Sequence, residues 1–199
     1  MKVKTHVKLA ELAFNSNTHI IPQGFSKFAF NFGLVMVDNS WLVKTHPHYM
    51  QKSLEYIIEK IGKLLLIKKF NAYHSMQLGI VVHYLCDFCC NAHILGTVGN
   101  IPNHIKYERD LQKYLLENYD NLIEHFKKAL GNRKFISHGL SSIKSSIENT
   151  LDNYIKGEAS YLLDIKQCVE LTSIVCSNIF NLSFDLAHNL KFRAKQIQT

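Results

Sequence analysis

The sequence is poor in proline and has no long apolar run. Only three prolines occur among 199 residues, and no stretch resembles a low-complexity linker. No window reaches the roughly 18 consecutive apolar residues that mark a transmembrane helix. The N-terminal residues include lysines but neither an apolar h-region nor a small-residue cleavage site, which excludes a signal peptide. We therefore expect a globular, cytoplasmic protein without a membrane span.

Cysteine is also scarce and is not arranged for disulfides. There are five cysteines, an odd number, and three of them cluster at Cys86, Cys89 and Cys90. This argues against a disulfide framework and indicates reduced thiols. Cys86 and Cys89 form a C-x-x-C pair, which can bind zinc. Because no second such pair exists and the setting is an apolar helix, we expect packing; thiolate ligation stays as the alternative.

Acidic residues are fewer than basic ones, 16 against 23, so the formal net charge is +7. A positive charge favours anionic partners such as phosphate esters, acidic lipid headgroups or nucleic acid. The lysines are spread along the chain rather than gathered in one stripe, so no specific nucleic-acid surface is expected.

Apolar residues recur at helical spacing, and no stretch alternates as strands do. We predict an all-α fold, a single-domain multi-helix bundle over residues 1–199. Loops are expected around Asn15–Trp41 and Leu95–Asn103. The predicted helices are Val7–Phe14, His48–Leu66, Phe70–Ala92, Ile105–Leu130 and two more from His138 onward, broken near Gly157.

The stretch IVVHYLCDFCCNAH carries the strongest chemical signal. His83 and Asp87 are four residues apart, so a helix places them on one face. His93 follows near the predicted helix end, and His104 with Glu108 repeats the same spacing on the next helix. The pattern H-x3-D-x5-H-x10-H-x3-E predicts two antiparallel helices that offer imidazole and carboxylate ligands to a metal cluster between them.

Each residue also has an interpretation without metal. A single histidine in an apolar helix is commonly a hydrogen-bonded core residue, and His104 with Glu108 fits an exposed helix pair. Asp87, however, has apolar neighbours on nearly every side, and a buried carboxylate requires a cation or several donors. Together the five residues favour a metal site.

Three blocks of the sequence resemble the zinc-dependent phospholipase C family, whose all-α fold is shared with S1/P1-type nucleases. They are THVKLAELA, with His6; FGLVMVDNSWLVKTHPHYMQKSLEYI, with an aspartate and then a histidine before a helix; and LGIVVHYLCDFCCNAHILGTVGNIPNHIKYERDL. The third block is the most specific. The C-terminal part of the chain matches only in being helical.

The resemblance implies two or three zinc ions. One would be held by Asp38, His48, His83 and Asp87, a second by His93, His104 and Glu108, and a third by His6 with Asp87 as a bridge. His46 is the alternative to His48, which is preferred because it starts the helical pattern. In secreted members an N-terminal tryptophan also holds the third ion through its amino group and carbonyl. Met1 stands five residues before His6 here, so occupancy of the third site is left open.

These assignments predict a zinc-dependent phosphodiester hydrolase acting on a phospholipid or related phosphoester. Clustered zinc ions supply a water-derived nucleophile near neutral pH and neutralise phosphate oxygens, and Asp38 would accept the proton of the attacking water. The alternatives are a nuclease or phosphomonoesterase on the same cluster, a non-catalytic protein with a structural or vestigial zinc site, and a membrane-surface module that uses the lysine-rich helices. Transient membrane-surface contact is compatible with the phospholipase interpretation.

Overall fold

The computed structural model describes residues 1–16, 21–94, 101–131 and 139–197, with side chains described as far as residue 183. Within these ranges all regular structure is helical, and the all-α prediction is confirmed. The elements are α1 (Val3–Ser16), α2 (Lys27–Met36), the 3-10 helix η1 (Val37–Asn39), α3 (Leu42–Thr45), α4 (Met50–Leu65), α5 (Ala72–Phe88), the 3-10 helix η2 (Asn91–His93), α6 (Ile101–Glu117), α7 (Tyr119–Leu130), α8 (Leu140–Lys156) and α9 (Tyr161–Ile197).

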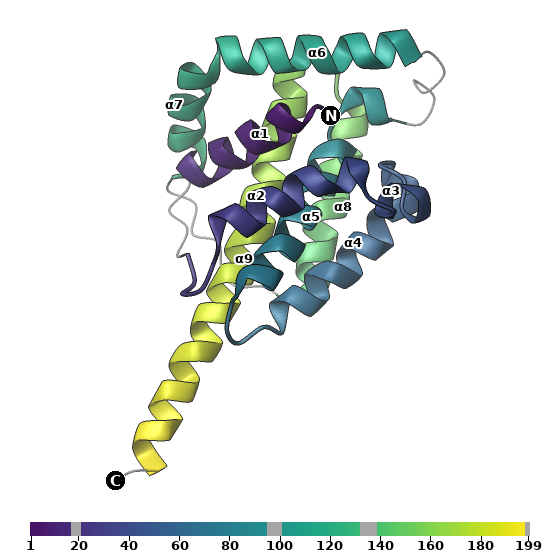
Figure 1. Cartoon of the computed structure of the whole chain (residues 1–199). Helices are drawn as coiled ribbons and strands as arrows, with labels where there is room; N and C mark the ends of the chain where they lie inside the picture. The colour runs from purple at the N-terminus through teal and green to yellow at the C-terminus, as the bar shows by residue number, and fades with distance from the viewer. Residues whose placement is uncertain (17–20, 95–100, 132–138, 198–199) are drawn as a thin grey trace.

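Helix α5 forms the centre of the molecule. Every residue from Leu78 to Phe88 is buried, because α2, α4, α9 and α1 all pack against this helix. In Figure 1, α2 crosses in front of α5, α6 lies across the top, and the last turns of α9 extend beyond the other helices. The N-terminus lies near the top, where α1, η2 and α6 meet.

Two glycines bring α2 and α5 unusually close. A Cβ atom at Gly33 would lie 2.1 Å from the carbonyl oxygen of Met76, and one at Gly79 would lie 2.1 Å from that of Phe30. No side chain fits at such separations, so only glycine permits this backbone approach. Helix α2 starts at Ser26, whose Oγ accepts from the Ala29 N–H at 3.3 Å.

The predicted loop at Asn15–Trp41 is wrong over much of its length, since α2 and η1 lie within it and α3 begins directly after it. Helix α2 exposes Phe28 and Phe32 and buries Phe30 and Leu34. Because apolar residues occupy both of its faces, the sequence shows no helical period of apolar and polar residues there. The predicted loop at Leu95–Asn103 is wrong from residue 101, where α6 begins; residues 95–100 lie outside the described residues.

The predicted helix bounds also need correction. Ile105–Leu130 is two helices, α6 and α7, which meet at Asn118, where the side-chain amide donates to the carbonyl of Tyr114 at 2.9 Å. The central helix ends at Phe88 rather than continuing to Ala92. Helix α6 packs on α1, η2 and α9 and crosses the top of the molecule (Figure 1), so it is not the antiparallel neighbour of α5 that was predicted.

Candidate metal centre

Four ligand-type side chains converge at the C-terminal half of α5. Asp38 comes from η1, His48 from the segment before α4, and His83 and Asp87 from α5 itself. One nitrogen or carboxylate oxygen from each lies within 4.8 Å of all the others. Residues up to 49 positions apart in sequence are therefore brought into a space the size of a coordination sphere.

The separations in this first group suit a small cation. His48 Nδ1 lies 2.7 Å from Asp87 Oδ2, and His83 Nε2 lies 3.1 Å from the same oxygen. The distance from His83 Nε2 to Asp38 Oδ1 is 3.5 Å. Ligands about 2.1 Å from a tetrahedral zinc ion stand about 3.4 Å from one another. The group therefore needs little adjustment to hold zinc.

His83 is held in the tautomer that a metal ligand requires. Its Nδ1 lies 2.7 Å from the carbonyl oxygen of Leu34 on α2 and donates a hydrogen bond to it. Since Nδ1 is used in this hydrogen bond, Nε2 is the ring nitrogen that faces the two carboxylates and the one that would bind a metal. Nε2 is buried and has no aligned hydrogen-bond partner. A buried nitrogen without a partner is costly in a metal-free core, which favours a role for it as a ligand.

A second group forms where η2 meets α6. Its members are His93, His104 and Glu108, whose ligand atoms also lie within 4.8 Å of one another. Glu108 Oε1 is 3.1 Å from His93 Nε2 and 2.9 Å from His104 Nε2. The turn of η2 directs His93 back toward α6, so the i, i+4 pair on α6 gains a third ligand from another element.

Asp87 connects the two groups. Its Oδ2 faces His48 and His83, while its Oδ1 lies 3.4 Å from His6 Nε2 and 3.8 Å from His93 Nε2. The carboxylate is fully buried. Its two oxygens thus point to different sets of nitrogens, as in a bridging carboxylate.

The amino group of Met1 lies on the Oδ1 side of Asp87, 2.6 Å from that oxygen. It is also 3.2 Å from Glu108 Oε1 and 3.2 Å from His93 Nε2. His6, one turn into α1, stacks its ring on that of His83 with centroids 4.0 Å apart, and neither of its ring nitrogens has an aligned hydrogen bond. Met1, His6 and Asp87 therefore surround a third position next to the two groups.

The charges of these buried groups depend on one another. Burial raises the pKa of Asp87, but the Met1 ammonium and the histidines outweigh burial and hold this pKa well below its usual range. Burial likewise lowers the pKa of His83, yet the charges of Asp87 and Asp38 raise it to about 9. The pKa of the Met1 amine is raised to about 11 against the effect of burial, chiefly by Asp87. Protons on His83 and Met1 thus balance the buried carboxylates, and a divalent cation would displace them.

A sequence comparison identifies the wider relationship. The family described as "Zinc dependent phospholipase C" matches residues 5–161 of the 199. The chain belongs to this family. Searches of curated proteins and of solved structures found no match. Membership supports zinc as the metal for the two groups, since the donor set of imidazole and carboxylate also suits other divalent cations.

All eight residues that the sequence suggested as ligands for this family member lie in the two groups or beside them. His48 rather than His46 reaches the first group; the ring of His46 instead stacks on Tyr56, with centroids 3.6 Å apart. Their ligation of zinc stays a prediction. Three aromatic residues stand close in sequence to the proposed ligands: Phe88 is buried in the core, Trp41 is exposed, and the ring of Tyr49 lies 6.4 Å from that of His93.

The cysteines beside the cluster pack in the core. All five are free and buried, and Cys168 Sγ donates to the carbonyl of Cys86 at 3.3 Å. The neighbouring Cys168 thiol and, after it, burial raise the pKa of the Cys86 thiol well above its ordinary value. A thiol held neutral in this way is a poor metal ligand, so the geometry favours packing over thiolate ligation.

One residue that supports the site was not identified from the sequence. Asp164, in the first turn of α9, is fully buried and accepts hydrogen bonds from the Asn91 N–H, the Tyr107 hydroxyl and the Tyr154 hydroxyl. Asn91 begins η2 and Tyr107 precedes Glu108, so Asp164 connects the two elements of the second group. Acidic residues are common in first helical turns, so its position gave no signal. It also lies beyond the family match.

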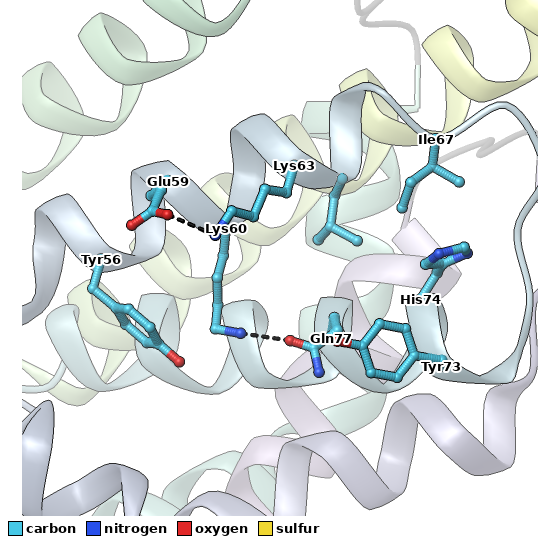
Figure 2. A pocket seen from close by; sticks show the side chains of 9 residues that line it. Tyr56, Glu59, Lys60, Lys63, Ile67, Tyr73, His74 and Gln77 are labelled. Carbon is cyan, nitrogen blue, oxygen red and sulfur yellow. Dashed lines mark hydrogen bonds and ion pairs between the residues drawn. The ribbon is translucent and has the colours of Figure 1, made fainter.

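A separate cavity of about 300 Å³ lies between α4 and α5 (Figure 2) and contains none of the proposed ligands. Lys60 reaches across it from α4 to the side-chain oxygen of Gln77 on α5, and Lys63 pairs with Glu59. Its lining comprises Tyr56, Glu59, Lys60, Lys63, Leu64, Ile67, Tyr73, His74 and Gln77. Its acid and lysines pair with neighbouring side chains, and the candidate metal-binding groups found among the described residues lie elsewhere, at the histidines.

Proposed function

We propose that the protein is a zinc-dependent phosphodiester hydrolase that acts, like a phospholipase C, on a phospholipid or related phosphoester. The observation that carries this proposal is the pair of imidazole–carboxylate groups joined through Asp87. Zinc bound there would supply Lewis-acid stabilisation of phosphate charge and lower the pKa of coordinated water. The family match supports the same metal and reaction class.

The proposed ligands fall into three sets, one for each zinc ion. Asp38, His48, His83 and Asp87 would hold one ion, and His93, His104 and Glu108 a second. His6, Asp87 and the Met1 amine would hold a third. Seven protein ligands for the first two ions leave at least one position open to water or substrate, which is typical of catalytic rather than structural zinc.

Asp38 is the residue we assign to proton transfer. Its side chain is 30% exposed, whereas those of His83 and Asp87 are fully buried, so water and a phosphate group would approach from the Asp38 side. Asp38 would accept a proton from the attacking water. As the water oxygen bonded to phosphorus, the bond from phosphorus to the diacylglycerol oxygen would break, and that oxygen would take up the proton that Asp38 had accepted. The products would be diacylglycerol and the phosphorylated headgroup.

The test combines metal content with turnover. Protein reconstituted with zinc is assayed on a phospholipid, a soluble choline phosphodiester, single-stranded DNA and a phosphomonoester. We expect phospholipid hydrolysis and at least two zinc ions per chain, with both reduced in His83→Ala and His48→Ala but not in His125→Ala, a change on the exposed face of α7. Preferred cleavage of DNA or the monoester would identify the other enzyme class. Bound zinc without any turnover would mean a structural site.

We further propose that residues 1–199 act as one domain in the cytoplasm. The family match spans α1 to the start of α9, and every helix it includes contributes to one continuous core. The five free cysteines suit a reducing compartment.

A further inference from the structure

The segment that carries Asp38 exposes three large aromatic side chains. Phe28 is 83% exposed and Phe32 53%, both on α2, and Trp41 at the start of α3 is 70% exposed. Phe28 and Phe32 are four residues apart and so share one face of α2. We refer to Phe28, Phe32 and Trp41 as the aromatic patch.

The patch is not an unavoidable result of how α2 packs. The opposite face of α2 buries Phe30, Gly33 and Leu34 in the close contact with α5. That contact buries the apolar face of α2 that packs in the core. The aromatic side chains on its outer face remain exposed and are not packed against the core in the described part of the chain. Exposed aromatic side chains in such number on one short segment mark an interaction surface.

The patch residues flank a proposed metal ligand along the chain. The 3-10 helix η1 directly follows α2 and contains Asp38, and Trp41 comes three residues later. Phe28 and Phe32 thus precede the solvent-accessible ligand along the chain, and Trp41 follows it. A surface that engages this segment would lie beside the open side of the first ligand group.

Lysines accompany the patch. Lys44 Nζ lies 4.9 Å from the centroid of the Trp41 ring, and the Lys27 side chain, next to Phe28, is 74% exposed, with Glu11 Oε1 4.0 Å away. Aromatic rings flanked by lysines suit the boundary of a phospholipid bilayer, where rings lie among headgroups and ammonium groups meet phosphates. No helix in the described residues is long and apolar enough to span a membrane.

We propose that the aromatic patch docks the protein on a phospholipid bilayer, with Phe28, Phe32 and Trp41 entering the headgroup region and Lys27 and Lys44 meeting lipid phosphates. Docking on this segment presents the headgroup phosphate to the Asp38 side of the metal groups. This inference rests on the proposed function, because a phospholipid substrate is what makes a bilayer the fitting partner.

Trp41 is the chain's only tryptophan, so tryptophan emission, excited at wavelengths where tyrosine does not absorb, reports on Trp41 alone. The full chain is titrated with vesicles of phosphatidylcholine and phosphatidylserine, with zinc and again with chelator to stop turnover. We expect a blue shift of Trp41 emission in both cases. The double variant Phe28→Ser/Phe32→Ser should bind vesicles about ten-fold more weakly or worse. Leu66→Ser, which removes an apolar residue 78% exposed at the end of α4, should bind like the parent protein.

The results separate this proposal from the proposed function. A blue shift with no turnover of any of the four substrates by the zinc-loaded protein leaves docking supported and refutes the hydrolase. Turnover of vesicle lipid with unshifted emission overturns docking, as does equal weakening by Leu66→Ser. For an active enzyme, the ratio of vesicle to soluble-substrate activity should fall about ten-fold in the double variant. A dimer in sedimentation that dissociates on the double substitution would show that a second copy, rather than a bilayer, covers the patch.

Discussion

Asp164 accepts a hydrogen bond from the backbone N–H of Asn91 at 3.2 Å. Its carboxylate also receives the hydroxyl of Tyr107 at 2.9 Å and that of Tyr154 at 2.7 Å. One buried side chain of α9 therefore holds η2 and α6 in a fixed relation, and these two elements supply the ligands of the second group. Outer residues of this kind fix ligand orientation in metal sites.

Replacing Asp164 with asparagine should weaken zinc binding at the second group. The amide nitrogen of asparagine cannot accept a hydrogen bond, so at least one of the three donors loses its partner. We expect about a ten-fold loss of affinity for one ion, measured by zinc titration against a chromophoric chelator. Asp152→Asn, on the exposed side of α8, is the control. Unchanged affinity in both variants would show that Asp164 serves folding alone.

Asp164 should also make stability depend on pH. Burial raises the pKa of this carboxyl from 3.8 to about 6, outweighing the hydrogen bonds that lower it. The folded state therefore holds the proton more tightly than the unfolded chain. This stabilisation is complete below about pH 4 and is lost as the pH rises through 6, a change of about 3 kcal/mol. Urea unfolding at several pH values should show this slope in the difference in unfolding free energy between the parent protein and Asp164→Asn, because the other buried ionisable groups contribute equally to both.

Asp87→Asn should reduce zinc content more than any single histidine substitution. The two oxygens of Asp87 face different groups, so the loss of its charge affects both. His48→Ala should impair only the first group and His104→Ala only the second, because each histidine reaches one group. Elemental analysis after dialysis would measure the zinc-to-protein ratio, with circular dichroism as the check on folding. Equal losses in all three variants would contradict a bridging role.

Gly33→Ala should destabilise the fold and disturb the metal centre together. The new Cβ would meet the carbonyl oxygen of Met76 at 2.1 Å, which forces α2 away from α5 at a cost of about 1–3 kcal/mol or more. The same movement would shift the Leu34 carbonyl that orients His83. Gly139→Ala is a matched control, since its Cβ would have no atom within 4 Å. Urea midpoints and zinc content of the two variants would be compared; a stable Gly33→Ala protein would contradict the packing argument.

Local sequence patterns were enough for the helical class and to indicate five of the eight proposed ligands. His83 with Asp87 and His104 with Glu108 share helix faces because of backbone geometry alone. The prediction failed at α2, where apolar side chains lie on both faces, and at Asn118, where one apparent helix is two. Both errors concern which face of a helix finds a partner, and a partner distant in sequence leaves no local pattern.

The sequence by itself determined that the chain forms helices and that it carries imidazole and carboxylate groups at ligand spacing, since both depend on neighbours within one or two turns. Only the tertiary structure decided that His48 rather than His46 enters the first group, that the Met1 amine lies beside Asp87, and that Asp164 supports η2 and α6. Those outcomes depend on contacts across many residues of chain. The start of α9 sets the last of them, and the close approach of α2 and α5 through Gly33 and Gly79 likewise places the Leu34 carbonyl against His83.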